Sequence, residues 1–341
     1  MSLPFVSLPT LHLIIPIQPF GVLVAAGVLI GAEVMRRYAL RHGVDEDDLR
    51  GLTAWVVATG FLGAHVFDVL AYERDRWLGA PGIPADPLLI LKLWDGISSY
   101  GGFLGGGMGY AFYMWWKRLT PGFWADATGT GLLLAFSIGR IGCTLVHDHI
   151  GRATHAALGV DYPAGELAKR QVLSEIHAGA PWSAGLEVIR CHNMAMYELM
   201  YLIPVNLVVL SLAFQKKRRL PAGFIAVLIM LLYVPVRFVL EFWRLNESDE
   251  RYYGLTFAQY SSVLLFGIAA YAATKIHQHA APAPLAAELG GKPGGRKSTM
   301  NQLAAAKAKA ASTDDSAASA ATATSTDAAA DQPTAKKSPK K

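Results

Sequence analysis

Residues 223–242 read GFIAVLIMLLYVPVRFVLEF, a run of twenty residues in which only Arg237 and Glu241 carry charge. A helix needs roughly 20 apolar residues to cross the hydrocarbon core of a bilayer. Because backbone polar groups find no water inside lipid, a stretch of this kind folds as a helix that pairs its own backbone. The sequence therefore predicts a transmembrane helix here.

Similar apolar blocks recur along the chain. Of its 341 residues, 52% are hydrophobic and 17% charged, and the mean hydropathy is +0.30. This composition excludes an ordinary soluble domain. Blocks of about the required length lie at 11–30, 52–70, 94–116, 125–146, 196–214, 223–242 and 257–273. We predict an all-α, polytopic transmembrane bundle of about seven spans, the first retained because no basic stretch or clear cleavage site accompanies it.

Basic residues alternate between the blocks and indicate the orientation. Clusters of Lys and Arg follow the first, third, fifth and seventh blocks, and the positive-inside rule assigns that side to the cytoplasm. The N-terminus is then expected outside and the C-terminal tail inside.

Two regions are not membrane spans. Residues 147–193 are polar and rich in Gly and Pro, so we predict a small extracytoplasmic cap between spans four and five. Residues 279–341 are rich in Ala, Lys, Ser and Thr and cannot bury enough apolar surface to fold. We expect a membrane domain over 1–278 and a disordered cytoplasmic tail. The Lys-rich end could touch anionic lipid or nucleic acid, but a solvated tail is favoured and no specific nucleic-acid partner is expected.

The two cysteines are too few for a disulfide framework or a structural zinc site. Cys143 and Cys191 both lie near the predicted outer boundary, so a disulfide between them is a hypothesis. His147, Asp148 and His149 alternate like metal ligands, yet loop histidines are more often solvated or hydrogen-bonded. We predict no metal and no cofactor.

Charges within the spans are the main functional signal, because an ionisable group in hydrocarbon costs at least about 2.5–3.5 kcal/mol. Arg140 lies late in span four, and Arg237, Glu241 and Arg244 are spaced to share one helix face. Two buried arginines at one level suit an anion such as phosphate. The alternative is a packing ion pair in which the arginines only neutralise Glu241.

Span three contains a second cluster, Ser98-Ser99-Tyr100-Gly101-Gly102, followed by glycines at four-residue spacing. The spaced glycines are typical of close helix packing. The polar run is less easily explained by packing, since a helix opened at such a point exposes backbone donors to a ligand.

Together these stretches resemble the prolipoprotein diacylglyceryl transferase family, over about residues 11–275. Their order and membrane sidedness make the combination specific. The motifs are WDGISSYGG at 94–102, GRIG at 139–142, DHIGR at 148–152, Tyr197-Glu198, RFVLEFWR at 237–244, and Gly254-Leu255-Thr256 with Gln259-Tyr260.

The resemblance implies a multi-pass enzyme of the bacterial inner membrane. It would move the diacylglyceryl group of phosphatidylglycerol to the lipobox cysteine thiol of a preprolipoprotein, forming a thioether and releasing glycerol phosphate. Its partners would be that lipid, the preprolipoprotein signal peptide and membrane lipid. The catalytic candidates are Arg140, Arg237, Glu241 and Tyr100. The substrate-binding candidates are Ser99, Gly101, Gly102, Asp148, Gly151, Tyr197, Glu198 and Arg244.

Three positions depart from the family pattern. Tyr100 stands where the family has histidine, Phe20 where it has tyrosine, and Cys143 where it has asparagine. Three interpretations therefore remain. The first is an active transferase with a different base, Glu241 or a cap histidine. The second is a degenerate paralogue that binds phosphatidylglycerol or lipoprotein precursors without transfer. The third is a small-solute transporter, which draws only on the intramembrane charges and glycines.

Overall fold

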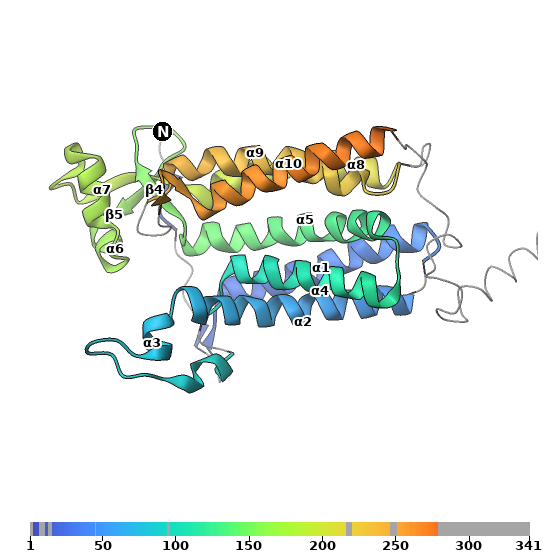
Figure 1. Cartoon of the computed structure of the whole chain (residues 1–341). Helices are drawn as coiled ribbons and strands as arrows, with labels where there is room; N and C mark the ends of the chain where they lie inside the picture. Colours follow the sequence, from blue (N-terminus) through green and yellow to red (C-terminus); the bar gives the residue numbers. More distant parts are fainter. Residues whose placement is uncertain are drawn as a thin grey trace, which may run out of the picture.

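The computed structural model describes residues 3–6, 11–12, 16–44, 46–93, 96–215, 220–245 and 251–278. The predicted tail at 279–341 and the motif residues Trp94 and Asp95 lie outside them. Long helices run side by side, and a smaller unit with a sheet sits at one end of the bundle (Figure 1).

Seven long helices make up the bundle in the described part of the chain, close to the predicted blocks. They are α1 (Pro19–Arg41), α2 (Glu46–Ala71), α4 (Ser99–Lys117), α5 (Pro121–Val146), α8 (Met194–Ala213), α9 (Phe224–Leu240) and α10 (Phe257–Gln278). All except α4 are long and apolar enough to cross a membrane, α9 when it is taken together with the short turn that continues it to Trp243. The glycine-rich α4 is not among these candidate spans, although it runs alongside α2 (Figure 1). The polytopic helical fold is confirmed with six such helices, and a crossing by α4 stays a prediction.

The first helix starts later than predicted. It begins at Pro19 rather than at residue 11, because proline at the first helical position has a suitable fixed φ and needs no N–H partner. The preceding residues instead form two short antiparallel strands, β2 (Leu11–His12) and β3 (Pro16–Ile17).

Glycines set the closest helix contacts, as the spacing in span three predicted. A Cβ added at Gly101 would lie 2.3 Å from the carbonyl oxygen of Gly63, and one at Gly105 would lie 2.4 Å from that of Thr59. The backbones of α2 and α4 therefore touch. A similar contact joins α1 to α5, where a Cβ at Gly131 would lie 2.3 Å from the oxygen of Gly31.

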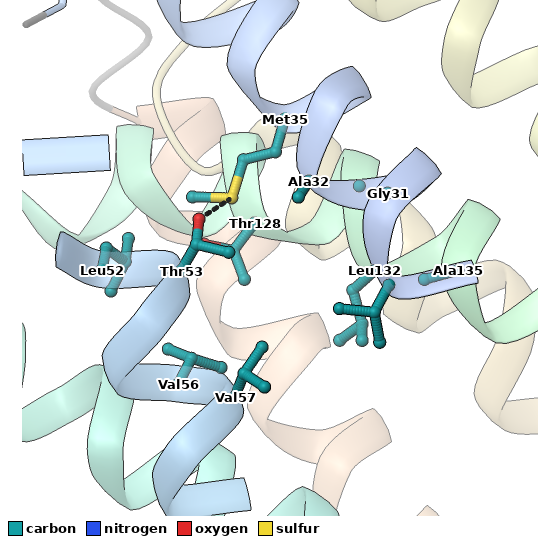
Figure 2. A pocket seen from close by; sticks show the side chains of 12 residues that line it. Gly31, Ala32, Met35, Leu52, Thr53, Val56, Val57, Thr128, Leu132 and Ala135 are labelled. Atoms are coloured by element: carbon teal, nitrogen blue, oxygen red, sulfur yellow. Dashed lines mark hydrogen bonds between the residues drawn. The ribbon is translucent and has the colours of Figure 1, made fainter. Parts of the chain in front are cut away.

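An apolar groove opens where α1, α2 and α5 meet (Figure 2). It encloses about 100 Å³, and the Thr53 hydroxyl lies 3.8 Å from the Met35 sulfur beside it. Its lining on α5 stops at Ala135, before Arg140. The groove is therefore separate from the charged positions that the sequence singles out.

The sequence predicts where the cap lies in the chain, but it does not predict that the cap contains a β-sheet. It contains a four-stranded sheet in the order β1–β5–β6–β4, so only the bundle is all-α. The strands are β1 (Leu3–Pro4), β4 (Ile150–Ala153), β5 (Val160–Pro163) and β6 (Val188–Asn193), and the cap helices are α6 (Ala164–Lys169), α7 (Leu173–Gly179) and η2 (Pro181–Ser183). Strand β1 pairs in parallel with β5, which ties the N-terminal segment to the cap.

Smaller elements complete the cap end. They are α3 (Arg74–Leu78), η1 (Pro87–Leu91), η3 (Glu241–Trp243), β7 (Arg251–Tyr252) and β8 (Leu255–Thr256). The cap, α3 and β1 lie at one end of the bundle, while the α1–α2 and α4–α5 turns lie at the other (Figure 1). This separation matches the predicted alternation of polar and basic segments.

A buried carboxylate holds the start of α9 at the end opposite the cap. Asp126 on α5 is 1% exposed. Its carboxylate accepts hydrogen bonds from the backbone N–H of Gly223, at 2.8 Å, and of Ala226, at 2.9 Å. These N–H groups have no partner within the helix, and the positive end of the helix dipole favours an anion there.

Replacing Asp126 by alanine removes both bonds and is expected to lower the free energy of unfolding by about 3 kcal/mol, since a hydrogen bond to a charged group contributes about 1.5–3 kcal/mol. Asp126→Asn keeps one acceptor oxygen and should lose less. Unfolding in detergent measures both variants, with exposed Asp75→Ala as the control. An Asp126→Ala protein as stable as the control would contradict this role.

Candidate active site

Arg140 is fixed by a glutamate from a neighbouring helix. Its side chain projects from α5 and is 10% exposed, and its Nε lies 2.9 Å from Oε2 of Glu198 on α8. The other oxygen of Glu198 accepts a hydrogen bond from the hydroxyl of Tyr233 on α9. The guanidinium also lies over the Phe136 ring, 4.8 Å from its centroid. Arg140 is therefore held in one orientation by α5, α8 and α9.

Arg237 is fixed by Glu241, as the spacing predicted. Its Nη1 lies 2.8 Å from Oε2 of Glu241, which has no exposed surface. Arg244 approaches the other carboxylate oxygen at 3.5 Å. The predicted continuous helix through Arg244 is wrong, because α9 ends at Leu240 and Arg244 has an extended backbone. Arg244 nevertheless reaches the same carboxylate by a short 3₁₀ turn.

The two arginine systems are one cluster. Arg140 and Arg237 are close enough to repel each other, and Arg237 is also attracted to Glu198. Like charges lie together in a low-dielectric interior only where carboxylates offset them. This arrangement holds two guanidinium groups in place near each other, and the pairing of an anion with both stays a prediction.

Tyr100 also belongs to this cluster. Its ring packs edge-on against Phe257 at the start of α10, with centroids 5.3 Å apart, and it interacts electrostatically with Arg237. The polar run was predicted inside a span, but α4 begins at Ser99, so Ser98 and Ser99 are at the helix start. There the first N–H groups have no partner within the helix.

The neighbouring candidates differ in role. Ser99 is exposed and Gly102 is half-buried, and substrate contact by these two stays a prediction. Gly101 is buried against α2, where any side chain would collide with the Gly63 carbonyl. Helix packing therefore explains why this residue is glycine, and substrate contact by Gly101 stays a prediction.

Asp148 and His149 follow the end of α5, and Nδ1 of the His149 imidazole is hydrogen-bonded to a carboxylate oxygen of Asp148. Together with Cys143 on the last turns of α5, their ligand atoms all lie within 4.8 Å of one another. Burial opposes ionisation of Asp148, but the His149 hydrogen bond and the charges of His149 and Arg140 hold the pKa of Asp148 below its usual value. Burial lowers the pKa of His149.

Gly151 and Tyr197 have structural roles. The backbone of Gly151 bridges to that of Arg244, and a Cβ there would lie 2.6 Å from the Trp243 carbonyl oxygen. Tyr197 points to the cap, where its hydroxyl donates to the Leu158 carbonyl at 3.2 Å. Substrate contact by either residue stays a prediction.

The predicted disulfide is wrong, because Cys143 and Cys191 are both free thiols. Cys191 is fully buried in the interior of the cap sheet. The side chain of His147 points away from those of Asp148 and His149. Its ring stacks on Phe5, and its Nε2 is 3.0 Å from the Val6 carbonyl oxygen. The alternating His-Asp-His pattern is therefore divided between the cap core and the site.

The downstream motif proves to be a helix cap. The Gln259 side chain accepts from the Thr256 N–H at 3.0 Å, and the Gln259 N–H donates to the Thr256 hydroxyl at 3.3 Å. This reciprocal pair starts α10. Gln259 also donates to the Phe238 carbonyl at 3.3 Å, which joins α10 to α9 beside Arg237.

Sequence reasoning missed Tyr233 and Phe136, because neither is charged and both resemble ordinary span residues. Their position could have been inferred from helix spacing, since each lies four residues before an arginine of the site. Phe20, one of the three departures from the family pattern, packs beside the site, where a Cβ on Gly142 would lie 2.9 Å from its ring.

Comparison with known proteins gives consistent matches. The family model described as prolipoprotein diacylglyceryl transferase matches residues 9–274. The phosphatidylglycerol–prolipoprotein diacylglyceryl transferase of Leifsonia xyli is 24% identical, covering 79% of this chain and 78% of its own. An enzyme of that name, numbered 2, from Streptomyces coelicolor is 26% identical, covering 81% and 82%. This chain belongs to the prolipoprotein diacylglyceryl transferase family.

Proposed function

We propose that the chain transfers the diacylglyceryl group of phosphatidylglycerol to the lipobox cysteine thiol of a preprolipoprotein. The observation that carries the proposal is the pair Arg140 and Arg237, which lie near each other in the membrane-embedded bundle and are each oriented by a buried glutamate. The names of the relatives supply the lipid and the protein substrate.

The reaction needs charge stabilisation where the lipid breaks. The thiolate sulfur attacks a glyceryl carbon, a carbon–sulfur bond forms, and the carbon–oxygen bond to phosphate breaks with its electron pair going to oxygen. Arg140 and Arg237 pair with the phosphate as its charge develops, which is the preorganised electrostatic role. Glu198 and Glu241 hold the guanidinium groups, so little reorganisation is needed during the reaction.

The setting is a bacterial inner membrane with the cap outside and the tail in the cytoplasm. The basic turns at the end opposite the cap support this orientation. Phosphatidylglycerol then enters from the bilayer, and the signal peptide of the precursor lies in the same membrane.

Binding without transfer is the second candidate function. It is favoured by Tyr100, Phe20 and Cys143, which replace residues expected from the family. The same arginine pair would then hold a phospholipid headgroup, but no reporter protein would gain mass. The transporter interpretation has no further observation in its favour.

Replacing Arg140 or Arg237 by alanine is expected to reduce transfer by about a hundredfold or more, corresponding to about 2.7–4 kcal/mol of lost transition-state stabilisation. Lysine should restore only part of the rate, because it keeps the charge but loses the planar fork. Initial rates with a lipobox peptide in phosphatidylglycerol micelles measure this. Arg190→Ala in the cap, which removes the partner of Asp161, is the matched control.

A double variant separates chemistry from folding. Arg140→Ala leaves Glu198 buried without its cation, which costs about 3–5 kcal/mol in stability. Arg140→Ala/Glu198→Ala removes both charges and should recover stability but remain inactive. Full transfer by the single or double variant would show that Arg140 is structural.

Tyr100 distinguishes a packing role from a headgroup contact. Tyr100→Phe keeps the ring against Phe257, so an unchanged KM for lipid means that the hydroxyl is not used, whereas a raised KM means a headgroup contact. Tyr100→His places an imidazole beside Arg237 and is expected to preserve or raise the transfer rate. Loss of transfer in properly inserted Tyr100→His protein would contradict the family-like arrangement of this position.

Orientation is tested with a reporter that is active only outside the cytoplasm. Fusions after Arg76 and Ala168 should be active, and fusions after Arg41, Lys117 and the C-terminus should be silent. The opposite pattern would place the arginine pair at the cytoplasmic face and remove the proposed reaction.

A further inference from the structure

A turn in the backbone brings three metal-ligand side chains together at the end of α5. His147 ends the helix in the left-handed conformation, with φ 52°. The chain then turns back, so that the Asp148 and His149 side chains return to the Cys143 thiol, with all three ligand atoms within 4.8 Å of one another. A thiol, a carboxylate and an imidazole are the three ligand types that zinc prefers.

We propose that Cys143, Asp148 and His149 form a Zn²⁺ site whose fourth coordination position takes the acceptor cysteine thiolate. This inference rests on the proposed function for its substrate, and it revises the sequence-based prediction of no metal. Three protein ligands with one open position are typical of catalytic rather than structural zinc.

Charge and access both suit a divalent cation. The Cys143 thiolate and the Asp148 carboxylate supply two negative charges, which balance Zn²⁺, while the nearby Arg140 is already paired with Glu198. The side chains of Asp148 and His149 are 37% and 21% exposed, so the cluster is partly accessible from outside the protein. Asp148 and His149 are already hydrogen-bonded to each other, so two of the three ligand side chains are brought together by the fold.

The proposed metal site lies next to the arginine that would bind the phosphate. Arg140 and Cys143 are three residues apart on α5 and therefore share a helix face. Coordination of the peptide thiol to zinc releases its proton to water, because a metal-bound thiol is deprotonated. The sulfur lone pair then forms the bond to the glyceryl carbon, and the departing phosphate oxygen keeps the electrons of the broken bond beside Arg140. No oxidant or reductant is needed.

The test uses the full chain without a histidine tag, purified in detergent and stripped with a chelator. Dialysis against Zn²⁺ or Co²⁺ should give one tightly bound ion per chain. Cys143→Ser, Asp148→Asn and His149→Gln should each weaken binding by at least about tenfold, as losses at metal sites commonly do. Cys191→Ala and His155→Ala, which lie away from the cluster, are the matched controls and should bind normally.

The open position is tested on the Co²⁺ protein. A lipobox peptide with cysteine should change the visible absorption of the bound cobalt, and the same peptide with serine should not. Absence of a stoichiometric ion, or unchanged binding by Cys143→Ser, overturns the metal site. If the absorption of the bound cobalt is unchanged by the cysteine peptide, the proposal that the acceptor thiolate takes the fourth coordination position is overturned.

The inference and the proposed function fail separately. Metal-free wild-type protein that transfers diacylglyceryl groups at full rate overturns the zinc proposal and leaves the transferase standing. Protein that binds one ion through the three residues but transfers nothing leaves the metal site standing and overturns the function.

Discussion

The structure of the membrane bundle around α5, α8 and α9 depends on how two buried arginines are neutralised. Arg140 and Arg237 lie close together in a low-dielectric interior, where each charge would be costly alone. Glu198 and Glu241 offset them, and the Tyr233 hydroxyl fixes the first of these carboxylates. Because these contacts cross between three helices, the relative positions of those helices follow from them.

Packing elsewhere supports this centre without adding charge to it. The glycine contacts between α2 and α4 bring the start of α4, and with it Tyr100, to the same end of the bundle as the cap. The Thr256–Gln259 cap and the bond from Gln259 to Phe238 hold α10 beside α9. At the opposite end Asp126 anchors α9. The site therefore has its supports on separate helices, and its geometry does not depend on one loop.

Sequence reasoning was most successful where one physical rule dominated. Length and hydropathy located the membrane helices, and the intramembrane charge rule located Arg140, Arg237 and Glu241. Sequence reasoning was less successful where a contact depends on the chain turning back on itself or on pairing with a distant segment. The cap sheet joins β1 to residues far along the chain, and the short 3₁₀ turn that brings Arg244 back to Glu241 has no clear sequence signal. The approach of Cys143 to Asp148 and His149 depends in the same way on the left-handed conformation of His147.

The central claim is that this arginine centre performs diacylglyceryl transfer rather than lipid binding alone. The most direct measurement is the mass of a reporter lipoprotein in a bacterial strain whose own transferase has been depleted, with this chain as the replacement. The account predicts growth of the strain and a mass gain of one diacylglyceryl group on the lipobox cysteine, with none on a reporter carrying serine there. A chain that is inserted and abundant but leaves the reporter unmodified would contradict it.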